Sequence, residues 1–299
     1  MSVGDLSITA LYTNGASTRQ DFPGARLLAC EDADMVFGIT NGFLRLATIT
    51  RRLPNLAASV IQRHAMLDHL LAEELAATRA PRGPFVLEIA AGLSPRGIAF
   101  TALPNMEDLD YVEVDLPAVI ARKRELLART LEGQDAALRE NLHLIAADVE
   151  RSDLSTLVEP ASQAQPARPL TVIAEGLFMY LDREARRHLW ARIAALLADA
   201  GGGSSFLFDL VPPAEEPPTG LGGRLLECAL KAATGGRTFE RDGATRDEIL
   251  ADLDASGFTS VETFEPLQVR QEWNLPGADE HTQMVVYRCR LAQRMSSTP

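Results

Sequence analysis

The stretch from Phe85 to Pro117 places the strongest constraint on how this chain folds. It opens with a short apolar run, Phe85–Ala90, whose length and flanking Gly and Pro favour a buried parallel strand. The small residues Ala90–Gly92 suit a tight turn or a close ligand, and Ser94–Pro95 suits the start of a helix. Tyr111–Asp115 predicts a second strand that ends on an acid. Together these elements predict the first βαβ unit of a nucleotide-binding α/β sheet.

The turn after the first predicted strand argues against a dinucleotide ligand. A dinucleotide fingerprint has the pattern G-x-G-x-x-G, but the corresponding positions here hold Ala90, Gly92 and Pro95. Because only one of the three glycines is present, and because Glu88 adds negative charge, a pyrophosphate is disfavoured. A ligand with a ribose and no phosphate fits better, and S-adenosylmethionine is the common example. The alternative is a βαβ unit that binds no ligand.

Acidic residues also mark the ends of the other predicted strands. Asp115 ends the second strand, where a ribose diol is usually held. Asp148 lies near the end of the predicted strand His143–Val149. Its carboxylate would accept a hydrogen bond from the amine of adenine, or Asp148 would be an ordinary turn or cap residue. Glu175 follows the predicted strand Leu170–Ala174 and is placed to pair with an ammonium group.

Four further side chains are candidates for the same site. Arg63 lies on a predicted helix, Asn55–Arg79, and would either direct its guanidinium at a ligand carboxylate or be solvated. His64 is better explained as a structural histidine than as a base. Tyr180 would order a substrate or pack with a satisfied hydroxyl, and Asp209 lies near the end of the fifth predicted strand, Ser205–Val211.

The order of the predicted elements indicates one domain over residues 1–299. We expect an α/β fold with a Rossmann-like, doubly wound sheet over 84–211 and 244–292. Residues 1–83 predict an N-terminal helical cap. The Pro- and Gly-rich insertion at 212–243 follows strand 5 and predicts a lid or substrate pocket.

Turn signals and alternating runs refine this outline at both ends. Asn14-Gly15, Pro23-Gly24 and Asn41-Gly42 predict turns that separate short helices in the cap. Ser260–Phe264 and Gln283–Leu291 predict two strands at the far edge of the sheet.

Composition limits the partners and the compartment. The net charge of −12 disfavours nucleic acid as a partner. The three cysteines form no C-x-x-C pair, which argues against a zinc site or a disulfide framework. We see no signal peptide and no apolar stretch long enough to cross a membrane, so we expect a cytoplasmic protein without a membrane partner. The oligomeric state is left open.

Several segments, in order along the chain, give it a family resemblance. The chain resembles the class I S-adenosylmethionine-dependent methyltransferases of the leucine carboxyl methyltransferase superfamily, and within it the TcmP-like O-methyltransferases of polyketide biosynthesis. The matching segments are Thr9–Thr13, Arg63–Asp68, Leu87–Gly97, Tyr111–Pro117, Ala147–Val149 and Glu175–Leu181.

The resemblance implies roles for residues around the methionine part of the cofactor. Arg63 would bind its carboxylate, Glu175 would meet its ammonium group, and the turn at Ala90 and Gly92 would lie beside it. In the superfamily a residue of the N-terminal segment contacts the cofactor, and Tyr12 would occupy that place. The lysine expected in the protein-methylating branch is missing, which weakens the case for a protein substrate. Ala90 departs from the usual glycine of the superfamily and agrees with the TcmP-like form.

The resemblance also implies a site for the nucleoside part. Asp115 would hold the ribose, and Asp148 with Val149 would flank adenine. Glu88 and Leu116 lie in the matching segments and complete the predicted cofactor site.

The chemistry expected from these residues is methyl transfer to oxygen. A carboxylate acceptor needs no general base, so we expect methylation of a small, polyketide-like or other secondary-metabolite acid to its methyl ester by in-line displacement. A phenol or hydroxyl acceptor is the alternative, for which His64, Asp209 and His281 are candidate bases. No metal site is evident. An NAD(P)-dependent oxidoreductase and a non-catalytic protein that binds S-adenosylmethionine remain as other classes.

Overall fold

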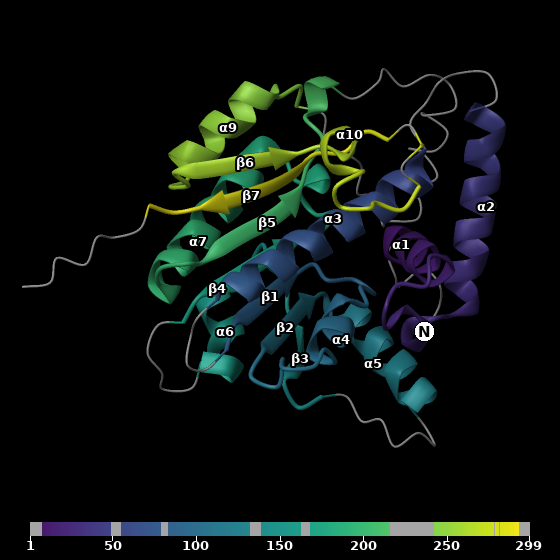
Figure 1. Ribbon diagram of the computed structural model, residues 1–299, viewed down its shortest axis with the longest axis horizontal. Helices are drawn as coiled ribbons and strands as arrows, with labels where there is room; N and C mark the ends of the chain where they lie inside the picture. Colours follow the sequence, from purple (N-terminus) through teal and green to yellow (C-terminus); the bar gives the residue numbers. More distant parts are fainter. Residues whose placement is uncertain are drawn as a thin grey trace, which may run out of the picture.

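The structure is a computed structural model that describes residues 8–48, 55–78, 83–131, 139–162, 168–215, 242–277, 279–280 and 282–292 (Figure 1). The central part of the predicted lid, residues 216–241, lies outside the described residues, as does His281. No helix in the described part of the chain is long and apolar enough to cross a membrane.

Seven strands form one sheet in the order β3-β2-β1-β4-β5-β7-β6. The pairs among β1 to β5 are parallel, whereas β7 runs antiparallel to both β5 and β6. The strand order reverses between β1 and β4, and ligands of such sheets bind outside the carboxyl ends at this point. The strands are β1 (Phe85–Ile89), β2 (Asp110–Asp115), β3 (Leu142–Ala146), β4 (Leu170–Ala174), β5 (Ser205–Asp209), β6 (Ser260–Phe264) and β7 (Val286–Arg290).

Helices cover both faces of this sheet. Helix α3 crosses one face in front of the strands, and α6 and α7 lie behind them (Figure 1). Two N-terminal helices, α1 and α2, pack together beside the sheet (Figure 1). The helices are α1 (Ile8–Arg19), α2 (Glu31–Thr48), α3 (Leu56–Ala77), α4 (Arg96–Thr101), α5 (Pro117–Leu131), α6 (Leu154–Ser162), α7 (Arg183–Ala200), α9 (Arg246–Ala255) and α10 (Pro266–Val269).

The alternation of side chains along each strand gives the two faces different cores. On β1, Leu87 and Ile89 join an apolar cluster with α6, α7 and α9, while Val86 faces the cluster built on α3. Glu88 alternates with Leu87 and therefore lies on the α3 side. The charged strand residues described in the next sections likewise point to the α3 side of the sheet.

Two of the three predicted turns in the cap are wrong. Asn14-Gly15 lies inside α1 and Asn41-Gly42 inside α2. A Cβ on Gly15 would lie 2.7 Å from the carbonyl oxygen of Ala33 and 2.8 Å from the Cβ of Phe37. The glycine therefore permits the close approach of α1 and α2 and does not form a turn. The third pair, Pro23-Gly24, does form a turn, with Gly24 at φ 80°.

Several predicted boundaries are also corrected. The third strand ends at Ala146, because Asp148 caps the following turn by accepting from the backbone N–H of Glu150 at 3.0 Å. The last strand begins at Val286 and not at Gln283. Helix α9 begins with a reciprocal capping box between Thr245 and Glu248.

Candidate functional site

Four strand ends bring the predicted cofactor residues to one edge of the sheet. Glu175 follows β4, Ala90 follows β1, Asp115 ends β2, and Asp148 lies two residues beyond β3. The order β4-β1-β2-β3 sets these residues side by side along the carboxyl edge. All four are partly exposed, so a ligand along this edge has access to each of them.

The turn after β1 has the tight geometry that its small residues predict. Ala90 and Gly92 adopt φ values of 52° and 56°. This left-handed region is unfavourable for alanine, so the turn is held by its surroundings. Asp115 contributes by accepting from the N–H groups of Gly92 and Leu116, each at 2.6 Å. Burial raises the pKa of Asp115, and these two N–H groups oppose the shift.

Glu175 is surrounded by three cationic or potentially cationic side chains. Its Oε1 accepts from Arg63 Nε at 3.0 Å, and its Oε2 accepts from Arg96 Nη2 at 2.7 Å. His64 Nδ1 lies 2.9 Å from the same Oε2. Burial favours a higher pKa for Glu175, but His64, Arg63 and Arg96 together hold the pKa well below its usual range. The carboxylate is therefore ionised at neutral pH.

Arg63 joins two strand ends from its position on α3. It donates to Glu175, and its Nη1 donates to Asp209 Oδ2 at 3.3 Å. Asp209 also accepts from the N–H of Gly176 at 2.6 Å and has no exposed surface. A Cβ on Gly176 would lie 3.1 Å from Arg63 Nη1, so glycine lets the guanidinium lie against the backbone. Asp209, a predicted substrate contact, instead orients Arg63.

Glu88 does not face a ligand, contrary to its place in the predicted cofactor site. Its side chain is fully buried, with Arg96 Nη1 donating to Oε1 at 2.5 Å and the Tyr111 hydroxyl donating to Oε2 at 2.7 Å. The position of Glu88 within β1 explains this, because its side chain points to the α3 face and not beyond the strand end.

His64 lies in the same cluster with little exposed surface. Its Nδ1 lies near Glu175 and also 2.9 Å from Arg96 Nη2, and its Nε2 lies 3.6 Å from Asp68 Oδ2. The ring contacts Phe22 at a centroid distance of 4.7 Å. These contacts agree with the structural role predicted for this histidine.

The two tyrosines lie on the cap side of the site. The Tyr180 hydroxyl is 3.0 Å from Thr9 Oγ1, which ties α1 to the segment after β4. Tyr12 stacks on Phe37, and its hydroxyl is buried with no hydrogen-bond partner among the described residues. Burial raises the pKa of Tyr12 to about 12. The structure thus brings Tyr180 to the site but packs Tyr12 into the apolar cap.

The predicted adenine end contains one exposed and one buried apolar side chain. Leu116 is 40% exposed directly after the second strand end. Val149 is buried in the apolar cluster of α6 and α7, so it offers little surface to a ligand. Asp148 keeps a partly exposed carboxylate, which caps its own turn and lies 3.5 Å from Arg151 Nε.

Arg96 and Asp68 are the members of the cluster to which the sequence assigned no role. Arg96 begins α4, has no exposed surface, and donates from Nε to Asp68 Oδ1 at 2.5 Å. The sequence contains one hint of this pair, since Arg96 lies in the same βαβ unit as Glu88, an acid within a predicted buried strand. Two opposite charges close in sequence do not by themselves predict a buried ion pair, because their distance in the folded chain is not known from the sequence.

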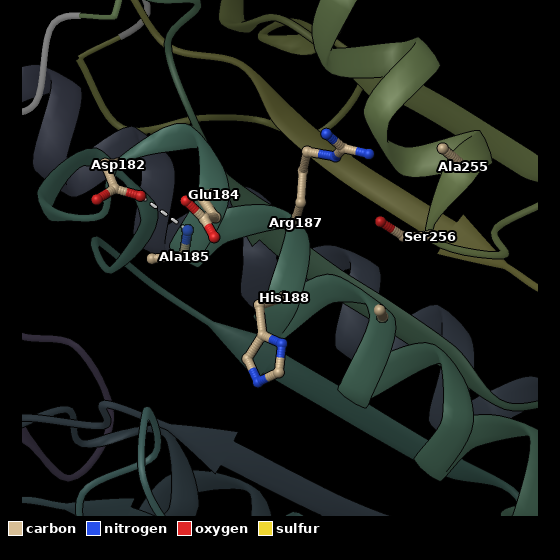
Figure 2. A pocket seen from close by; sticks show the side chains of 8 residues that line it. Asp182, Glu184, Ala185, Arg187, His188, Ala255 and Ser256 are labelled. Atoms are coloured by element: carbon tan, nitrogen blue, oxygen red, sulfur yellow. Dashed lines mark hydrogen bonds between the residues drawn. The ribbon is translucent and has the colours of Figure 1, made fainter.

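The described residues contain no group of three or more His, Cys, Asp or Glu side chains placed to hold a metal ion. A separate open pocket of about 560 Å³ lies between α7 and α9. Figure 2 shows Arg187 directed toward α9 in this pocket, with Asp182 accepting from the backbone of Ala185. The pocket shares no residue with the cluster at the carboxyl edge.

Comparison with known proteins identifies the family. A sequence model of the family described as leucine carboxyl methyltransferase matches residues 19–194, more than half of the chain. The chain belongs to the leucine carboxyl methyltransferase family. This confirms the prediction at the level of the leucine carboxyl methyltransferase family.

Two relatives carry the name "Putative S-adenosyl-L-methionine-dependent methyltransferase". One from Mycobacterium sp. (strain KMS) is 37% identical over 113 residues, 38% of this chain and 35% of the relative. The other, from Mycolicibacterium paratuberculosis, is 31% identical over 216 residues, 71% of this chain and 64% of the relative. The matches therefore span between about a third and two thirds of the length of these relatives. The cofactor predicted from the sequence is the one that these family members are named for.

Solved structures show the same architecture. A "putative methyltransferase" from Thermobifida fusca matches with a TM-score of 0.57 at 18% identity, over 96% of this chain and 96% of that chain. The CurJ carbon methyltransferase matches with a TM-score of 0.51 at 16% identity, over 93% of this chain and 70% of that chain. At these identities the likeness shows the fold alone, and the predicted α/β methyltransferase fold is confirmed.

Proposed function

We propose that this protein is an S-adenosylmethionine-dependent O-methyltransferase that converts the carboxylate of a small acid to a methyl ester. The acid would be polyketide-like or another secondary metabolite, as the resemblance to TcmP-like enzymes suggests. Family membership and the set of strand-end residues support the choice of cofactor. The state of His64 and Asp209, the two candidate bases in the described part of the chain, supports the choice of acceptor.

The charge of the cluster suits the cofactor. Four carboxylates, those of Asp68, Glu88, Glu175 and Asp209, surround the two guanidinium groups of Arg63 and Arg96. The surplus of negative charge favours a ligand that carries ammonium and sulfonium groups. Arg63 donates two of its five N–H groups to described residues of the cluster, so the others are candidates to bind a ligand carboxylate.

The same residues provide places for each part of the cofactor. Glu175 would accept from the ammonium group, Arg63 would donate to the carboxylate, and Asp115 would accept from the ribose hydroxyls. Leu116 would contact adenine from its exposed position, and Asp148 would accept from its amine. When bound, the cofactor supplies a methyl group on a cationic sulfur.

The observation that carries the choice of acceptor is the state of His64. Both of its ring nitrogens face carboxylates, its Nδ1 also lies beside Arg96, and its side chain has little exposure. Asp209 is occupied by Arg63 and Gly176 below the surface. Neither side chain is available to take a proton from a phenol, whereas a carboxylate acceptor is already ionised. The chain then needs only to bind, orient and exclude water, and α1 covers the site through the Thr9–Tyr180 contact.

The test begins with the cofactor and ends with the product. Calorimetric titration should give micromolar binding of S-adenosylmethionine and S-adenosylhomocysteine, with none of NADH or NADPH. Failure of both sulfur ligands would remove the proposed function. Matched aromatic acids and phenols would then be incubated with methyl-labelled cofactor. Mild alkali releases labelled methanol from an ester and not from an aryl ether, so alkali-stable label alone would favour the phenol alternative.

A further inference from the structure

We propose that Arg96 is a positioning residue that holds the Glu175 carboxylate in place for the ammonium group of the cofactor. This inference rests on the proposed function, and it gives a role to a residue that does not face the ligand. The carrying observation is that one fully buried guanidinium joins three carboxylates from three elements. These are Asp68 on α3, Glu88 on β1 and Glu175 after β4.

The hydrogen bonds around Glu175 leave a specific place for a ligand. Oε2 lies within hydrogen-bond distance of both Arg96 Nη2 and His64 Nδ1, at 2.7 and 2.9 Å. Among the described residues, Oε1 accepts only from Arg63, at 3.0 Å. Because each carboxylate oxygen has two acceptor positions, Oε1 keeps one for an incoming ammonium group. Arg96 thus occupies Oε2 and leaves an acceptor position on Oε1 available.

The remaining contacts of Arg96 hold the guanidinium itself. Its Nε and Nη1 donate to Asp68 and Glu88 at 2.5 Å each, and Glu88 is oriented in turn by Tyr111. A planar guanidinium can serve three carboxylates at once, which a lysine ammonium on a flexible stem does less well. Asp68 and Glu88 therefore act on Glu175 through Arg96.

Removal of Arg96 alone would leave Glu88 buried and unpaired, so a single change confounds folding with binding. The double variant R96M/E88Q removes one positive and one negative charge together and keeps an acceptor for Tyr111. The matched control is R186M, which removes a buried arginine from α7, where Arg186 bonds to Leu181 and Asp242.

The ligands separate positioning from a general loss of structure. S-adenosylhomocysteine carries the ammonium group, whereas 5′-deoxy-5′-methylthioadenosine has the nucleoside and sulfur without it. We expect R96M/E88Q to weaken S-adenosylhomocysteine at least tenfold and leave methylthioadenosine within twofold of native. R186M should lower the melting temperature and leave the ratio of the two affinities unchanged. R96K keeps the charge, so it should fold and show an intermediate, three- to tenfold loss for S-adenosylhomocysteine only.

The pH dependence of binding gives a second readout. The charged and titratable groups facing Glu175 are Arg63, His64 and Asp68 on α3, Arg96 on α4, Glu88 on β1 and Asp209 on β5. Without Arg96 the pKa of Glu175 rises, so the carboxylate is lost at a higher pH. S-adenosylhomocysteine affinity should therefore fall more steeply from pH 7.5 to 5 in R96M/E88Q than in the native protein.

Two outcomes are distinguishable. If the native protein binds neither S-adenosylmethionine nor S-adenosylhomocysteine, the proposed function fails and this inference fails with it. If the native protein binds both, but folded R96M/E88Q and R96K keep native affinity for S-adenosylhomocysteine or lose both ligands equally, the inference alone is overturned.

Discussion

The two faces of the central sheet are both buried, but they are built from different chemistry. The face toward α6, α7 and α9 packs aromatic rings, with Phe208 lying 4.7 Å from the ring centroids of both Phe206 and Tyr287. The face toward α3, α4 and α5 buries charged side chains, among them Glu88 with Arg96 and Glu113 with Lys123. Strand residues of opposite parity thus enter two apolar cores, and the core toward α3, α4 and α5, here called the ionic face, also encloses these ion pairs.

This difference between the two faces indicates which one stabilises the fold and which one supports ligand binding. Burial of aromatic rings stabilises a fold directly, whereas buried ion pairs contribute little net stability because of the cost of desolvation. The ionic face lies beneath the strand ends at which the cofactor residues meet. We infer that Arg96, held by Glu88, orients Glu175 from this face. The predictions below test this division from the largest expected effect to the smallest.

The aromatic face should control stability alone. Phe208→Ala removes a fully buried ring and should lower the free energy of unfolding by about 3–5 kcal/mol. Urea denaturation measures this loss. At a temperature where the variant is folded, its affinity for S-adenosylhomocysteine should equal that of the native protein. A parallel loss of affinity would show that the two faces are not separable.

The ionic face should give stability a pH dependence through Glu113. Burial, opposed by Lys123, raises the pKa of Glu113 from 4.5 to about 7. Between these values the folded chain keeps a proton that the unfolded chain has lost, so this contribution is full at low pH and lost as the pH rises. The unfolding free energy of the native protein minus that of Glu113→Gln should therefore fall as the pH rises through this range. Denaturation at several pH values measures it, and a flat difference would contradict it.

Glu175 should affect the cofactor more than any other single carboxylate at the edge. Glu175→Gln replaces a charged acceptor by a neutral one. Because a hydrogen bond to a charged group contributes about 1.5–3 kcal/mol, the affinity for S-adenosylmethionine should fall roughly 10- to 150-fold. Calorimetry measures the change, and methylthioadenosine is the control ligand, whose affinity should stay near the native value. Unchanged S-adenosylmethionine affinity would remove Glu175 from the site.

Asp115 should give the smallest effect, and a different pattern. Asp115→Asn keeps an acceptor for the N–H of Gly92 but weakens the acceptor for ribose hydroxyls. We expect about a tenfold loss, near 1.4 kcal/mol, for S-adenosylhomocysteine and methylthioadenosine alike. Competition binding with both ligands checks this. A loss of affinity confined to S-adenosylhomocysteine would indicate that Asp115 contacts the amino-acid part of the cofactor and not the ribose.

Much of the fold followed from local patterns. The apolar runs, the small turn at Ala90–Gly92 and the cap at Thr245 act over a few residues, and the structure contains each of them. The predicted turns that proved wrong were also inferred from local sequence. Gly15 has the signature of a turn, yet it serves a helix contact with Ala33 and Phe37, which lie about twenty residues away. Local chemistry does not reveal a partner at that distance.

The candidate site divides in the same way. By itself, the sequence determined the family, the α/β fold and the acids Asp115, Asp148 and Glu175 at or just after strand ends, because the apolar runs that form the strands and the residues that follow them are local features. The tertiary structure alone decided that Glu88 points inward and that Arg96 bridges it to Glu175. These contacts join α4, β1 and the end of β4 across distances that no spacing rule specifies. A charge acquires its role from the partners that folding brings to it.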